Sequence, residues 1–125
     1  MTFMILQIKD IRNTDYAFRS WDEAKAHGFN ISDYKTVYIG ERESESILDD
    51  LWVEFNINRP DDFRGHSLSV SDIVIILNDD MEWYYCDSIG WANITEEINN
   101  ILNEYGIDRP PNRWYNGHKI REEVL

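Results

Sequence analysis

The chain has 125 residues, of which 24 are Asp or Glu and 12 are Lys or Arg, so its formal net charge is −12. This length fits one domain, and the 42% of hydrophobic residues, rich in Trp, Tyr and Phe, suffices for a folded core and argues against disorder. The acidic excess argues against direct binding to nucleic acids or anionic membranes, because both attract basic surfaces.

The first half of the chain predicts two strands and a short helix. Residues 3–8 are mostly apolar and predict a strand. Ser20 and Glu23 form a capping-box pattern that begins a short helix. Residues 34–39 are β-branched and aromatic, which predicts a second strand that Gly40 ends.

The second half predicts two longer helices and a hairpin. One helix has an apolar face made of Ile47, Leu48, Leu51, Trp52 and Phe55. A loop over 57–69 follows, and the apolar run 73–77 predicts a buried central strand. After an Asn-Asp-Asp turn, residues 81–86 pair back as a hairpin. A last helix begins at Thr95 and ends at Gly106.

These elements predict a single α+β domain over residues 1–108. We expect a small, mostly antiparallel sheet of about four strands, with two to three helices packed on one face. Residues 109–125 form a basic tail that contains Trp114 and Tyr115. We expect the tail to dock on the domain, although its two aromatics are also suited to stacking on bases or anchoring a protein partner.

The sequence offers little to a catalytic or metal-binding interpretation. The three histidines are far apart and show none of the paired spacings of a zinc site. A nucleophilic set of Cys86, His66 and Asp72 can be written down, but a thiol in an aromatic-rich strand is more often a small buried hydrophobe. Nucleophile-elbow and phosphate-binding glycine motifs are absent from the sequence. We expect a non-enzymatic protein without cofactor or metal.

The location of the protein follows from its cysteine content and hydropathy. Cys86 is the single cysteine, which is typical of a reducing compartment. No apolar run reaches the roughly 18 residues that span a bilayer. The apolar first residues lack the basic leader and cleavage site of a secretion signal. We expect a cytoplasmic protein that does not bind membranes.

The most regular polar pattern of the chain comprises Gly65, Ser67, Ser69, Ser71 and Asp72. Simple alternation places Leu68 and Val70 on one side of this segment and the serines on the other. The segment is then either a binding edge or a rigid corner. Short polar side chains just before a strand bind neighbouring backbone groups, which favours the corner.

The same segment resembles the signature of the YodL-like domain family. The similar residues are 65–74 (GHSLSVSDIV), with Phe55-Asn56 and Pro60 before them and 84–91 (YYCDSIGW) after them. The strand at 34–40 also looks like the lead-in of the family, so the resemblance covers about 34–94. One departure is Trp91, where the usual aromatic is often Phe.

This resemblance implies a biological setting but no catalytic activity. YodL-like domains occur in Gram-positive bacteria, often in mobile-element and phage proteins, where they can sit beside anti-restriction modules. The family has no established catalytic residues or cofactors, so none are transferred to this chain.

The charge is distributed unevenly along the chain. Residues 1–40 contain five acids and five bases, and residues 41–64 contain eight acids and three bases. Residues 65–108 contain nine acids and no Lys or Arg, whereas the tail has two acids and four bases. An acidic surface often serves only solubility. Rows of carboxylates also resemble phosphates and suit a basic nucleic-acid channel.

We therefore expect a phage or mobile-element counter-defence factor, of the anti-CRISPR or anti-restriction type. It would bind a protein partner, such as a basic nucleic-acid-binding protein or nuclease, through a DNA-mimicking surface. The expected contact residues are Glu45, Asp49, Asp50, Glu54, Asp79, Asp80, Glu82, Glu96 and Glu97. The alternative is a general interaction module that docks on a host protein through surface aromatics, Trp114 and Tyr115 among them.

Overall fold

The structure is a computed structural model of the chain and describes residues 1–104. Its strands are β1 (Thr2–Ile8), β2 (Tyr34–Glu41), β3 (Ile73–Leu77), β4 (Met81–Cys86) and β5 (Trp91–Asn93). Its α-helices are α1 (Trp21–Ala26), α2 (Ile47–Ile57) and α3 (Thr95–Glu104). Two short 3-10 helices, η1 (Ile11–Asn13) and η2 (Ile31–Asp33), complete the elements of the described part.

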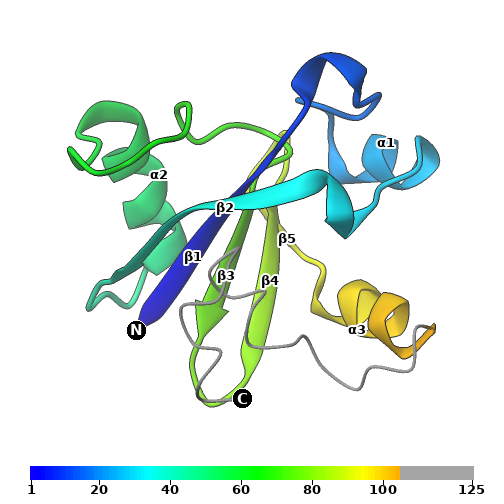
Figure 1. The fold of residues 1–125 in the computed structure, drawn as a ribbon. Helices are drawn as coiled ribbons and strands as arrows, with labels where there is room; N and C mark the ends of the chain where they lie inside the picture. The colour runs from blue at the N-terminus through cyan, green and yellow to red at the C-terminus, as the bar shows by residue number, and fades with distance from the viewer. Residues whose placement is uncertain (105–125) are drawn as a thin grey trace.

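The strands form one antiparallel sheet in the order β2-β1-β3-β4-β5 (Figure 1). The α+β class is confirmed, and β3 is the central strand as its apolar run predicts. The sheet has five strands where about four are expected. The additional strand, β5, has only three residues, too few for a recognisable alternating pattern.

The helices cover both faces of the sheet, so the prediction that they pack on one face is wrong. In Figure 1, α2 lies on one side of the sheet, and α1 and α3 lie on the other. The physical reason is visible in β1, which lies between β2 and β3. In β1, Met4 and Leu6 pack on the α1 and α3 side, whereas Phe3 and Ile5 pack on the α2 side. A strand that is apolar at successive positions needs cover on both faces.

The start of α1 and the buried side chains of α3 agree with the sequence prediction. The Ser20 side chain accepts a hydrogen bond from the backbone N–H of Glu23, so the capping box of α1 is confirmed. In α3, Ile98 and Leu102 are fully buried. The expected end of this helix at Gly106 and the whole basic tail lie outside the described residues. No helix of the described part is long and apolar enough to cross a membrane.

The strand register brings two distant connections to the same end of the sheet. Thr2, at the start of β1, pairs with Glu41 at the end of β2 and with Leu77 at the end of β3. The segment that leads from β2 into α2 and the turn between β3 and β4 therefore leave the sheet at one end. This end carries most of the predicted contact residues.

Candidate protein-binding surface and polar corner

The predicted acids gather around the end of the sheet that Thr2, Glu41 and Leu77 mark. We call this region the acidic end. Its members on the segment before α2 and in the first turn of α2 are Glu45, Asp49 and Asp50. Its members on the β3–β4 turn, at the start of β4 and in the first turn of α3 are Asp79, Asp80, Glu82, Glu96 and Glu97. Acids that are far apart in the sequence thus lie toward the same end of the sheet.

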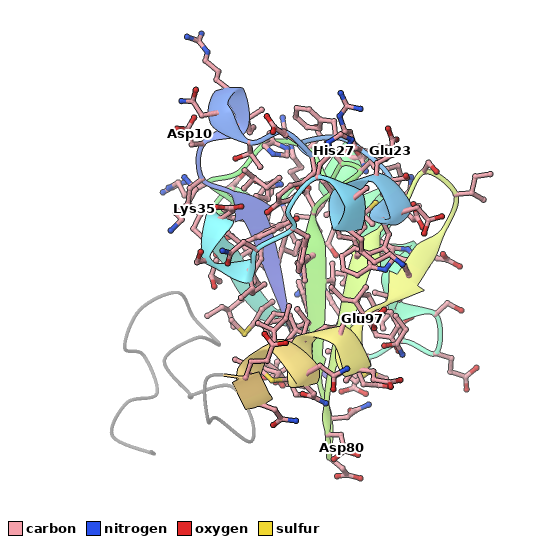
Figure 2. The ribbon with its side chains drawn as sticks, turned by 90° about the vertical axis from the view of Figure 1, so that its right-hand side faces the viewer. Asp10, Glu23, His27, Lys35, Asp80 and Glu97 are labelled. Carbon is pink, nitrogen blue, oxygen red and sulfur yellow. The ribbon has the colours of Figure 1, made fainter. Side chains whose placement is uncertain are left out.

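The acidic end wraps around the sheet and does not form one flat face. Its α2 members lie on one side of the sheet, and its α3 members lie on the other. Figure 2 shows Asp80 and Glu97 toward one end of the molecule, and Lys35 toward the opposite end together with the acids Asp10 and Glu23. The opposite end thus carries charges of both signs, whereas the β3–β4 turn and α3 belong to the segment 65–108, which contains no Lys or Arg.

Glu54 differs from the other predicted contacts because it already has a partner. Arg42 Nη2 lies 2.5 Å from Glu54 Oε2, and Arg42 Nε lies 3.0 Å from Glu54 Oε1. This two-point geometry is the strong form of the Arg–carboxylate pair. The hydrogen bonds to Glu54 raise the pKa of the Arg42 guanidinium, which stays charged. Glu54 therefore fixes α2 to the end of β2 and offers little free charge.

The serine-rich segment forms a rigid corner built around Asp72. Asp72 Oδ2 accepts hydrogen bonds from the Ser69 backbone N–H at 2.8 Å and from Gln7 Nε2 at 3.0 Å. His66 Nε2 lies 3.9 Å from the other carboxylate oxygen. The expected bonding of short polar side chains to neighbouring backbone is confirmed. The predicted alternation, with the serines on the side opposite Leu68, is not observed, because Ser71 is buried together with Leu68.

Gln7 is the residue that joins this corner to the sheet. It is a buried amide on β1, and its Oε1 accepts the His66 backbone N–H at 3.1 Å while its Nε2 donates to the His66 carbonyl at 2.9 Å. Gly65 leaves the room for this contact, because a Cβ at that position would lie 2.2 Å from Gln7 Oε1. The sequence contained a signal for this role, since a glutamine inside an apolar strand needs hydrogen-bond partners.

Two residues at the corner adopt the left-handed backbone region that non-glycine residues rarely occupy. They are Phe18, with φ of 65°, and Ser71, with φ of 83°. The Phe18 backbone N–H donates to Ser71 Oγ at 2.9 Å, and the Tyr34 hydroxyl donates to the Ser71 carbonyl. These bonds hold both residues in a conformation that costs about 1–3 kcal/mol each. No sequence pattern predicts a left-handed phenylalanine.

Burial is the main cause of the pKa shifts of Asp72 and Tyr34 at the corner. It raises the pKa of the Asp72 carboxyl to about 8, and the hydrogen bonds from Ser69 and Gln7 only partly oppose this shift. Burial likewise raises the pKa of the Tyr34 hydroxyl far above its ordinary value. Around neutral pH, these groups are protonated, and they stabilise the corner as neutral hydrogen-bonding groups.

The nucleophilic set of Cys86, His66 and Asp72 does not have a reactive thiol. Cys86 is buried, and burial followed by the nearby Asp72 and Asp87 carboxylates raises its pKa to about 12. A thiol of this kind is protonated and inert at neutral pH. Among residues 1–104, no three His, Cys, Asp or Glu side chains group together as a metal site would need.

Comparison with protein-family models gives a match to the YodL-like domain over residues 2–97. The chain belongs to the YodL-like domain family. The match extends beyond the segment where the resemblance was visible and includes β1, which carries Gln7. No curated protein and no solved structure matches the chain. In the YodL-like fold seen here, the serine-rich signature serves as the corner that connects α2 to the central strand.

Proposed function

We propose that this YodL-like chain is a non-enzymatic, cytoplasmic protein-binding domain whose partner is a basic nucleic-acid-handling enzyme. The carboxylates of the acidic end take the place of phosphates and occupy a groove that otherwise holds nucleic acid. The mobile-element setting that the family resemblance implies supports a counter-defence role, of the anti-CRISPR or anti-restriction type. The interaction requires neither a metal nor a cofactor.

The observation that carries this proposal is the gathering of acids at one end of the sheet, with the nearby cations already paired. Arg42 is held by Glu54, and the amino group of Met1 lies 3.3 Å from Glu43 Oε1. Within residues 1–104, Asp79, Asp80 and Glu97 take part in no ion pair. Such a field attracts a positively charged partner and speeds its association at low ionic strength.

A second candidate function is a general interaction module that docks through surface aromatics. The exposed side chains of Phe18 and Trp52 favour it. Trp114 and Tyr115, expected for this role, lie outside the described residues. This function involves little long-range attraction, so salt separates the two candidates.

The test is capture from a bacterial lysate at low and high salt, followed by affinity measurements with the identified protein. The variants are two matched pairs in the acidic end, Asp49→Asn with Asp50→Asn and Asp79→Asn with Asp80→Asn. The control pair is Asp15→Asn with Asp22→Asn, which removes the same charge from the neutral first third of the chain.

We expect a basic nucleic-acid-binding partner that salt releases. At least one acidic-end pair should weaken its affinity about tenfold or more, and the control pair should not. Capture that is insensitive to salt, or equal loss in all three double variants, would contradict the proposal. Sensitivity to aromatic substitutions without salt dependence would favour the second candidate.

A further inference from the structure

Helix α2 uses only a narrow stripe to pack on the sheet. Ile47, Leu51 and Phe55, which repeat every four residues, are its buried side chains. Leu48 is half-buried beside them. The sequence predicts that Trp52 also faces the core, but its side chain is 41% exposed. Trp52 is therefore an apolar side chain of α2 that solvent can reach.

The outward face of α2 is unusually apolar. Val53 is 54% exposed and Ile57 is 80% exposed, and together with Trp52 they account for three of the seven large exposed hydrophobics in the described part. Val53 and Ile57 lie four residues apart and so are neighbours on the helix surface. Isolated exposed hydrophobics are ordinary, but three on one short helix form a patch that needs an explanation.

The acidic residues of the outward face lie at the start of α2. Asp49 and Asp50 occupy the first turn, and Glu45 precedes it, so the beginning of the helix belongs to the acidic end. The exposed apolar residues follow in the middle and at the end. Arg42, just after β2, is paired with Glu54, and the exposed Arg59 follows two residues after the helix ends. The outward face is therefore anionic at its start and apolar beyond.

We propose that the outward face of α2 is the docking surface for the basic protein partner, which offers an apolar pocket bordered by Lys or Arg. Val53 and Ile57, with Trp52, fill the pocket, and Asp49 and Asp50 pair with the basic rim. This inference rests on the proposed function and names the surface that performs it. A buried apolar centre with a charged rim is the usual anatomy of a protein interface.

Other occupants fit this charge pattern less well. Nucleic acids and anionic membranes are repelled by the acidic first turn. A second copy of the chain would bring the carboxylates of Glu45, Asp49 and Asp50 against the single exposed cation just past α2, Arg59, so like charges would outnumber opposite ones. Self-association through α2 is therefore an outcome that would overturn the proposal, and a sizing measurement across a range of protein concentrations detects it.

The direct test uses a defined probe, a short amphipathic helical peptide of leucine and lysine, with amide NMR shifts of the full chain as the readout. A serine–lysine peptide of equal charge serves as the charge-only probe. The test variant is Val53→Ser with Ile57→Ser. The control is Ile11→Ser with Ile89→Ser, which removes two exposed apolar side chains elsewhere. Circular dichroism verifies that both variants fold.

We expect the leucine–lysine peptide to shift the amides of residues 49–57, and the test variant to weaken its binding about tenfold while the control does not. The serine–lysine peptide should bind more weakly. Shifts concentrated at residues 79–97, or equal affinity for the test variant, would overturn the proposal. If the captured partner responds to Asp79→Asn with Asp80→Asn but not to the α2 variants, the proposed function survives and this docking surface does not.

Discussion

At the scale of single residues, the corner around Asp72 shows how a family signature can be structural. A carboxyl is buried beside His66, and its neighbours from β2 and β4, Tyr34 and Cys86, are protonated around neutral pH. Because burial raises the pKa of Asp72 to about 8, the folded protein holds this proton more tightly than the unfolded chain does. Stability from this group is complete below about pH 4 and is lost as the pH rises through 8.

Asp72→Asn should remove this pH dependence. The amide oxygen still accepts the Ser69 N–H, but the side chain cannot ionise. The free energy of unfolding of the variant, relative to the parent, should therefore increase by at least about 2 kcal/mol between pH 5 and pH 9. Urea unfolding at several pH values measures it. Asp15→Asn, at an exposed position, is the control with no such trend, and parallel profiles for parent and Asp72→Asn would refute the assignment.

At the scale of elements, α2 is attached to the sheet by its buried stripe and by one ion pair. Glu54→Gln breaks the two-point contact with Arg42, which holds the helix against the end of β2. We expect a loss of about 0.5–1 kcal/mol in the free energy of unfolding, since the pair is only partly exposed. Glu45→Gln, at an exposed acid just before the helix, should cause no loss. A loss that persists unchanged at high salt would mean that packing, and not the pair, holds Glu54.

The sequence was informative for elements that bury a periodic pattern and poor for features that depend on distant partners. The run 73–77 and the capping box at Ser20 were sufficient to predict β3 and the start of α1. The periodicity of α2 predicts a buried Trp52, but periodicity defines only the apolar face of a helix and not how much of that face the sheet covers. The ion pair of Glu54 and the contact of Gln7 with His66 join elements that only the folded chain brings together.

At the scale of the whole molecule, the acidic end concentrates repulsion in one region. Charges of one sign destabilise the compact state, and salt screens this repulsion as the Debye length falls from about 30 Å at 0.01 M to about 3 Å at 1 M. We expect the urea midpoint of the parent to rise with salt. Asp79→Asn with Asp80→Asn should raise the midpoint at low salt, and this gain should vanish at high salt.

The matched pair Asp15→Asn with Asp22→Asn should behave differently. These acids lie in the first third of the chain, where acids and bases are equal in number, and Lys25 Nζ lies 3.6 Å from Asp22. Their removal should leave the low-salt midpoint unchanged or slightly lower. Equal gains from both pairs would show that the net charge alone matters and that its concentration at one end does not.

The position of β1 between β2 and β3 has a consequence for how the chain is made. β1 pairs with β2 after a long connection that contains α1, and its other edge pairs with β3, whose Leu77 lies opposite Thr2. During synthesis, the backbone N–H and C=O groups on one edge of β1 and the amide of Gln7 have no partner until β3 and the corner emerge. We expect the first 57 residues alone to associate rather than fold. Folding of this domain therefore depends on rapid pairing of β1 with β3. We expect a nascent chain that stalls before residue 77 to be the form most prone to association.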